Sequence, residues 1–433
     1  MKLLNQKIIS KLTNVILFLI VFLAPLNLFF KLTQTTAYVT GLLIDYLIPK
    51  FYLVDGLIIC FLSVYLIKLI LNKNYFKQNE VKIIQPSKNV FIFLAILTIF
   101  IIRQAFTENP IASVYFLLRL VELGSFFYIL LKQKKEINKN SIFIAIILTL
   151  VFQSSLAIYQ FHQQKSLFKY QVLGETKLTQ YYGIAKGVFN GEEKILPYGT
   201  TAHPNNLGGV LVIYIMVAFT LLKNECKTYL KYKNLKSTLL AFTLIPSLYT
   251  LYLTQSVSAV LTFNFFIIAM LFSTFAEKIN LQNLRTTIQK YFLHPLTFIS
   301  LLTAFPLLIA YLAELNPSSF SLTRRSFLNQ AAWEMFIDNI WWGTGLNNFI
   351  LQLGEYIHTR QIKNFIQPVH HVGLLFLAET GLLGILLLVY LIKLNKKQLN
   401  LNKIFFLIPI ITLDHYLITQ PAGLISVFLL FLI

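Results

Sequence analysis

Long apolar runs separated by short lysine-rich segments constrain the fold of this chain more than any other feature. A helix needs about 20 apolar residues to cross a bilayer, and somewhat fewer where neighbouring helices cover its ends. Candidate spans lie at residues 8–30, 51–71, 89–106, 110–131, 141–161, 204–222, 237–253, 257–275, 295–313, 371–391, 404–418 and 421–433. The last two are short. We therefore predict an all-α polytopic transmembrane helical bundle of about 11–12 spans, forming a single integral membrane domain over residues 1–433.

The composition excludes several other classes of protein. Hydrophobic residues make up 56% of the chain and charged residues only 12%, so the apolar side chains could not all be hidden in one aqueous core. The net charge of +20 would indicate nucleic-acid binding in a soluble protein. Here the lysines lie between apolar runs, where they set membrane topology, and we predict no nucleic-acid partner. Cys60 and Cys226 are the only cysteines, so neither a disulfide framework nor a cysteine-ligated metal site is expected.

The lysines also predict the orientation of the chain. With the N terminus in the cytoplasm, the lysine clusters around Lys73, Lys132, Lys233 and Lys393 all fall on the inner side. The two long loops, residues 162–202 and 314–370, then lie on the outer face of the cytoplasmic (inner) membrane, and we expect any active site there. The apolar stretch 37–48 is too short to cross the membrane, and we interpret it as re-entrant or interfacial.

The second long loop contains one segment with a helical period. Apolar residues of the segment 325–340 recur on one stripe: Phe327, Leu328, Ala331, Ala332, Met335, Phe336 and Ile340. We predict an amphipathic helix that lies on or against the bundle and covers the site.

The few arginines indicate an anionic substrate. Only six of the 37 basic residues are arginines, and five are expected at or beyond the outer half of the bundle: Arg103, Arg119, Arg324, Arg325 and Arg360. A guanidinium binds phosphate through two parallel hydrogen bonds, which an ammonium cannot do. Any one of them could equally touch lipid headgroups or pair with an acid. Arg119 is the strongest case, because it lies inside a span one turn before Glu122.

Histidines begin two of the spans on the expected outer side. His203 precedes Pro204, and His370 and His371 precede Val372. A neutral histidine is the commonest general base, although a lone interfacial histidine is more often a polar anchor. No phosphate loop, dinucleotide-binding turn or zinc helix is present, and no two aspartates are paired. We therefore expect neither a cofactor nor a catalytic metal.

Three stretches in order resemble the O-antigen ligase and O-antigen polymerase superfamily of bacterial envelope enzymes. Residues 199–205 (Gly-Thr-Thr-Ala-His-Pro-Asn) are similar to the motif that opens a middle span. Residues 322–349 are similar to the family's arginine, amphipathic helix and Gly-x-Gly loop. His370 and His371, followed after nine residues by Gly381 and Gly384, are similar to its strongest motif. The resemblance covers the chain from about residue 199 to the C terminus.

The chain also departs from the family pattern. His371 stands where relatives have an amide or hydroxyl side chain, and Asn329 and Ile340 replace a usual tryptophan and proline. Many relatives have arginines at the positions of Leu196-Pro197 and Ser256-Val257-Ser258. If those arginines bind the diphosphate in relatives, this chain must use others, for which Arg103, Arg119 and the pair Arg324 and Arg325 are the candidates.

The resemblance implies a GT-C-like, metal-independent, inverting glycosyltransferase. It would move a glycan from an undecaprenyl-diphosphate carrier to a glycan or lipid-anchored sugar acceptor, with membrane lipid around it. His370 would be the base and Arg325 would stabilise the leaving group. The substrate-binding residues would be Arg324, His371, Arg119, Arg103, His203, Asn205 and Glu379. Ligase and polymerase both remain open. The rivals are a flippase or transporter of lipid-linked oligosaccharide and a purely structural membrane scaffold.

Overall fold

The computed structural model describes residues 2–71, 88–168, 170–178, 183–225, 230–278, 295–358, 366–395 and 401–433. Most of these residues are helical. The helices before the second half of the chain are α1 (Lys2–Leu23), α2 (Leu53–Leu71), α4 (Lys88–Gln104), α5 (Pro110–Lys132), α6 (Lys139–Gln163), α7 (Tyr170–Leu173) and α8 (Pro204–Glu225). The later helices are α9 (Leu230–Leu253), α10 (Val257–Lys278), α12 (Pro295–Leu315), α13 (Phe320–Asp338), α14 (Phe349–Tyr356), α15 (Val372–Asn395), η3 (Leu401–Leu407), α16 (Ile408–Leu413), α17 (Tyr416–Thr419) and α18 (Pro421–Leu432).

The helices confirm the predicted all-α polytopic architecture. The described residues contain six helices long and apolar enough to cross a membrane, namely α2, α5, α6, α8, α12 and α15, and five shorter apolar helices. Together these correspond to every predicted span except 237–253, which forms the C-terminal part of α9. Two predicted spans differ in detail. The run 8–30 is helical only to Leu23, and the run 404–418 is divided among η3, α16 and α17.

In the described part of the chain, three short antiparallel hairpins interrupt the helices. They are formed by β1 (Phe29–Lys31) with β4 (Lys50–Tyr52), β2 (Tyr38–Val39) with β3 (Leu42–Leu43), and β5 (Lys186–Phe189) with β6 (Glu192–Ile195). The stretch 37–48 lies inside the first of these hairpins. Its buried residues Ala37, Leu47 and Ile48 pack with Leu351 of α14, so the segment joins the cover of the bundle.

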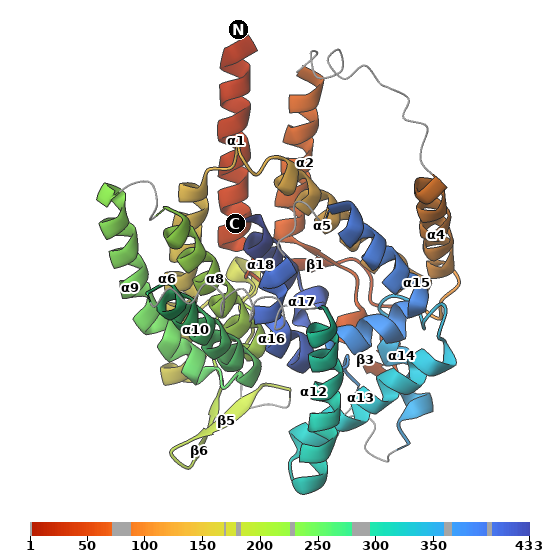
Figure 1. Ribbon diagram of the computed structural model, residues 1–433. Coiled ribbons are helices and arrows are strands. Elements are labelled where there is room, and N and C mark those ends of the chain that lie inside the picture. The colour runs from red at the N-terminus through yellow and green to blue at the C-terminus, as the bar shows by residue number, and fades with distance from the viewer. Residues whose placement is uncertain are drawn as a thin grey trace.

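The two ends of the bundle differ in what they carry (Figure 1). The N terminus and the C-terminal end of α2 lie at one end, whereas α13 and the β5–β6 hairpin lie at the other. Helix α8 runs through the middle, where its residues 211–218 include a long run of fully buried side chains. Helices α6, α9, α10 and α18 all pack on α8. The Tyr214 hydroxyl donates to the Val21 carbonyl at 2.7 Å and so ties α8 to α1.

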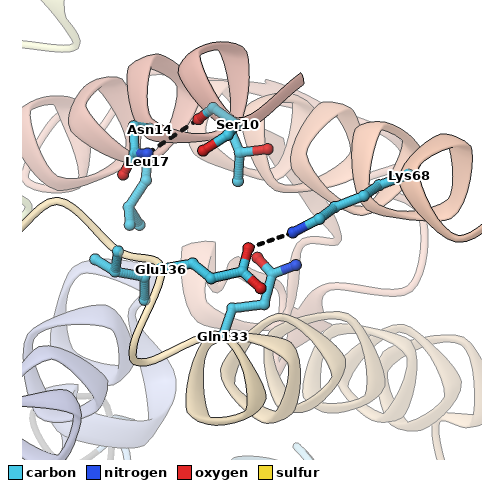
Figure 2. Close-up of a pocket in the computed structure, with 8 residues that line it drawn as sticks. Ser10, Asn14, Leu17, Lys68, Gln133 and Glu136 are labelled. Atoms are coloured by element: carbon cyan, nitrogen blue, oxygen red, sulfur yellow. Dashed lines mark hydrogen bonds and ion pairs between the residues drawn. The ribbon is translucent and has the colours of Figure 1, made fainter. Parts of the chain in front are cut away.

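An ion pair joins the helices at the end that carries the N terminus. Figure 2 shows Lys68 of α2 reaching Glu136, which follows α5, across a small pocket that α1 also lines. Next to it, the backbone N–H of Asn138 donates to the side chain of Asn14 at 2.9 Å. These contacts fix α1, α2 and the α5–α6 connection to one another.

Helix α15 is broken at Gly381, and the break receives the loop that follows α13. Gly381 has φ of 58° and ψ of −160°, a conformation that is essentially restricted to glycine. The backbone N–H groups of Leu382 and Leu383 donate to the carbonyls of Ile340 and Trp341, at 2.8 and 3.1 Å. A Cβ at Gly381 would lie 2.7 Å from the backbone of Trp341 and Gly343. The glycine therefore allows the loop and the helix to pair through their backbones.

Replacing Gly381 with alanine should destabilise the protein. The strained backbone alone costs about 1–3 kcal/mol, and the added Cβ overlaps backbone atoms that cannot move independently. Gly124→Ala is the matched control, because a Cβ at this helical position of α5 meets no atom within 4 Å and alanine favours a helix by roughly 0.5–1 kcal/mol. Thermal unfolding midpoints in detergent should fall for Gly381→Ala and stay equal or rise for Gly124→Ala. Equal midpoints for Gly381→Ala and the parent protein would contradict this account.

Candidate functional site

Basic residues from four separate segments converge near the start of α8. His203 precedes α8, Arg324 and Arg325 lie in α13, His370 precedes α15, and His415 joins α16 to α17. The ring centroids of His370 and His415 are 5.2 Å apart, with the rings edge to face. His370 is close enough to interact electrostatically with the other four. We call this group of five residues the basic recess.

The five side chains of the basic recess combine deep positions with partial exposure. His203 is exposed and the other four are half-buried, although His203, His370 and His415 lie deep among surrounding residues. All five side chains therefore remain partly accessible to a polar ligand.

The environment of His370 favours a neutral imidazole. Burial lowers the pKa of His370 well below its ordinary value, and the nearby His415, Arg325 and Arg324 lower it further. Its Nδ1 atom is buried and has no hydrogen-bond partner in the described part of the chain. A neutral imidazole with a free nitrogen can accept a proton.

The two arginines of the recess are only partly balanced by acidic groups. Among the described residues, neither Arg324 nor Arg325 takes part in an ion pair. The Arg324 guanidinium lies 5.4 Å from the centroid of the Phe320 ring, and its Nε is buried without a hydrogen-bond partner. Burial and the neighbouring Arg325 lower the pKa of Arg324, but an arginine stays protonated in proteins. The recess is therefore electropositive and suited to an anion.

Asp414 lies behind the recess and is held by polar groups from other helices. Its carboxylate accepts a hydrogen bond from the Asn205 amide at 2.8 Å and another from the Ser258 hydroxyl. It is also within electrostatic range of Arg325. Ser258 belongs to the stretch where many relatives are expected to have an arginine. In this chain, neutral donors and the more distant Arg325 balance the buried carboxylate.

Two glutamines of α6 position the loop that carries His203. The Gln160 Oε1 atom accepts from the backbone N–H groups of Tyr198 and Gly199, at 3.0 and 2.8 Å. Two turns earlier in α6, the Gln153 side-chain oxygen accepts a hydrogen bond from the backbone N–H of Thr200 at 3.0 Å. The loop thus pairs its backbone with side chains inside the bundle. His203 then accepts from the Asn205 N–H through Nδ1 at 3.1 Å, which leaves the proton of its neutral form on Nε2.

Arg103 and Glu379, both predicted to bind substrate, hold the loop after α13. Arg103 donates to the carbonyls of Phe106 and Gly343, at 3.0 and 3.3 Å. The buried Glu379 accepts from the N–H of Phe349 at 3.4 Å, at the start of α14. None of the described contacts of these two residues reaches the basic recess.

His371 points away from its neighbour His370. Its Nδ1 accepts from the N–H of Leu374 at 3.1 Å, which caps the start of α15. Its Nε2 lies 3.1 Å from the Leu302 carbonyl of α12. Both ring nitrogens are thus engaged in holding helices together, and the side chain is buried.

Arg119 belongs to a second polar cluster within the spans. Its guanidinium pairs with Asp55 at 3.3 Å, lies 4.4 Å from the Tyr52 ring centroid and donates to the Tyr115 hydroxyl at 2.8 Å. Arg119 and Asp55 are both buried, so each offsets the desolvation of the other. The described contacts of Arg119 tie α2 to α5 and none reaches the basic recess.

Sequence reasoning missed His415 and Tyr46. The rings of these residues are 6.3 Å apart, edge to face, and the buried Tyr46 hydroxyl has no hydrogen-bond partner among the described residues. The available signal was the pair Asp414 and His415 inside an apolar run, since ionisable residues within spans are usually functional. No comparable signal marked Tyr46, which lies in the short apolar stretch.

The charged residues of the site do not form an evident metal centre. Within the described ranges, no group of three or more histidine, cysteine, aspartate or glutamate side chains is close enough to hold a metal ion. The donors of the recess are guanidinium and imidazole groups.

Comparison with known proteins bears on the second half of the chain. No curated protein matches the sequence. The family model described as O-antigen ligase matches residues 242–389, a range that includes Arg324, Arg325 and His370 of the basic recess. This match supports assigning the chain to the O-antigen ligase and polymerase superfamily, whose members are membrane glycosyltransferases of envelope polysaccharide synthesis.

Proposed function

We propose that the chain transfers a glycan from an undecaprenyl-diphosphate carrier to an acceptor hydroxyl on the outer face of the cytoplasmic membrane. The family match supports a membrane glycosyltransferase. The basic recess supports the proposal that the donor is a diphosphate and that a histidine activates the acceptor hydroxyl. The observation that carries the proposal is the position of His370, whose pKa is lowered by burial and whose Nδ1 has no hydrogen-bond partner among the described residues, close to two arginines that form no ion pair with those residues.

His370 acts as the general base in this proposal. The acceptor oxygen attacks the anomeric carbon of the donor while the hydroxyl proton passes to His370. The bond between the anomeric carbon and the diphosphate oxygen breaks at the same time. Attack from the face opposite the leaving group inverts the configuration at the anomeric carbon.

Arg325 and Arg324 stabilise the leaving diphosphate. Its oxygen takes the electron pair of the broken bond, and the two guanidinium groups offset the charge that develops there. Charge stabilisation of this kind is usually the largest single contribution to catalysis. Diphosphate is a good leaving group, so we propose that neither a nucleotide nor a metal ion takes part.

Replacing His370 with alanine should lower the transfer rate about 10²- to 10⁴-fold, the usual contribution of a general base. The variant should still insert and fold, because the described contacts of His370 include no hydrogen bond. The measurement is transfer from a lipid-linked donor by purified protein, with thermal stability as the folding control. A fully active His370→Ala protein would end the catalytic assignment.

His371→Asn is the matched control for the neighbouring position. Asparagine is among the best residues for capping a helix, so it can replace the cap that His371 provides to Leu374. Activity should stay near that of the parent protein. An inactive but folded His371→Asn protein would show that the base has been assigned to the wrong histidine.

The proposed reaction predicts a specific pH dependence. His370 must be unprotonated to act, so activity falls as the pH drops below its pKa. Without donor, burial and the neighbouring cations hold this pKa below 6.5. Bound diphosphate adds negative charge beside the ring and raises the pKa. The acid limb of kcat, which reports the donor complex, should therefore lie at higher pH than that of kcat/KM measured for the donor. If the acid limbs of kcat and kcat/KM fell at the same pH, this would contradict the placement of the diphosphate beside His370.

Transfer by the purified protein should persist in EDTA. The basic recess provides guanidinium and imidazole groups in place of the carboxylates that usually hold a catalytic Mg²⁺ or Mn²⁺. Activity should be measured in detergent, where effects of the chelator on membranes play no part. Loss of activity that Mg²⁺ or Mn²⁺ specifically restores would overturn the metal-independent mechanism.

Deletion of the gene followed by sizing of the surface glycan separates the two forms of the proposal. Single repeat units left on the carrier would identify a polymerase. Full-length chains that are not attached to their acceptor would identify a ligase. Carrier-linked repeats confined to the cytoplasmic leaflet would instead support the flippase alternative.

A further inference from the structure

All three tryptophans of the chain lie in one exposed region. Trp333 is on α13, and Trp341 and Trp342 follow it. Their exposed fractions are 51%, 61% and 46%. Such exposure of large aromatic side chains is costly in water, and their concentration in one place indicates a specific environment.

Helix α13 has three distinct faces. One face is buried against α12, α14 and α15, through Leu328, Ala331, Ala332, Met335 and Phe336. Successive residues of a helix are about 100° apart, which places Trp333 at one edge of the exposed side and Ile337 about 40° further round, opposite the buried face. Gln330 and Glu334, which are hydrogen-bonded to each other at 2.8 Å, and then Asp338 follow beyond Ile337. Ile337 is 50% exposed.

This arrangement fits a helix that lies in the plane of a membrane interface. Helix α13 is not among the described helices apolar enough to cross the membrane. A helix with an apolar flank and a charged flank sits between headgroups and acyl chains. Tryptophan is enriched at this depth because its ring is amphipathic.

Spanning helices that hold α13 also expose apolar side chains. At the end of α12, which packs on α13, Tyr311 and Leu315 are each 58% exposed. Beyond α13, the backbone of Trp341 is bonded to α15, and α15 packs on α4. The segment from Trp333 to Trp342 is thus attached to the spanning helices α12 and α15, and α12 also exposes apolar side chains.

We propose that Trp333, Ile337, Trp341 and Trp342 lie in the boundary between headgroups and acyl chains of one leaflet, and that a lipid surface is their partner. Helix α13 is then anchored at a fixed depth. Because Arg324 and Arg325 belong to the same helix, the anchor holds their guanidinium groups close to the level of lipid phosphates. This inference goes beyond the proposed function and does not depend on it.

Intrinsic fluorescence tests the anchor without a label, because all three tryptophans of the chain belong to the proposed anchor. The protein is placed in phosphatidylcholine nanodiscs, whose two faces are both open to solvent. The lipid carries bromine either near the headgroup end or deep in the acyl chain. Shallow bromine should cause a larger loss of fluorescence than deep bromine, and aqueous iodide should cause little loss.

A matched variant provides the control. With all three tryptophans replaced by phenylalanine, Asp338→Trp places a single tryptophan on the exposed, charged side of α13, about 100° from Ile337 and about 140° from Trp333. The fluorescence of this variant should be quenched by iodide and not by brominated lipid.

Three results would overturn the proposal, and none depends on glycan transfer. If iodide quenched the parent protein more than brominated lipid did, the three tryptophans would face water. Equal or greater loss with deep bromine would place them inside the acyl region. Protection from both quenchers would show that a second copy or another protein covers them.

Discussion

A bilayer leaves no water to pair with the backbone, so every interruption of a spanning helix must be paired within the protein. Two interruptions meet this requirement in different ways. At Gly381, the carbonyls of the loop after α13 accept the freed N–H groups of α15. At Asp414, the helix ends with its N–H donating to the Ile410 carbonyl at 3.0 Å, while the carboxylate binds Asn205 and Ser258. The first break attaches α13 to the bundle, and the second turns His415 toward His370.

Much of the architecture could be predicted because it follows from local pattern. A span is recognised by the length of its apolar run. The lysines between the runs predict the orientation of the chain, and neither inference needs knowledge of a tertiary contact. The amphipathic helix was also predictable, although it begins at Phe320, earlier than its apolar stripe suggests. Phe327 and Ile340, which were assigned to that stripe, are 44% and 38% exposed. A stripe defines a face of the helix but not how much of it a neighbour covers.

The contacts that build the site could not be predicted because they join distant segments. The sequence shows Arg119 beside Glu122, yet its ion pair is with Asp55 on another helix. It shows Gln153 and Gln160 as ordinary residues of an apolar run, yet both bind the backbone of the loop that carries His203. His415 lies in a run read as one continuous span, and its role depends on a break that only tertiary contacts reveal.

The positive charge of the basic recess is only partly balanced within the described part of the protein. Arg324 and Arg325 lie close to each other and to His203 and His370, and Asp414 is within electrostatic range of Arg325 alone. Partly buried positive charges destabilise a fold unless they are compensated. The histidines reduce this cost by remaining neutral. In the proposed reaction, the donor diphosphate supplies the missing negative charge and thereby raises the proton affinity of His370. The base thus becomes strong only after the donor is bound, which favours an order in which the donor binds first and the acceptor hydroxyl is activated second.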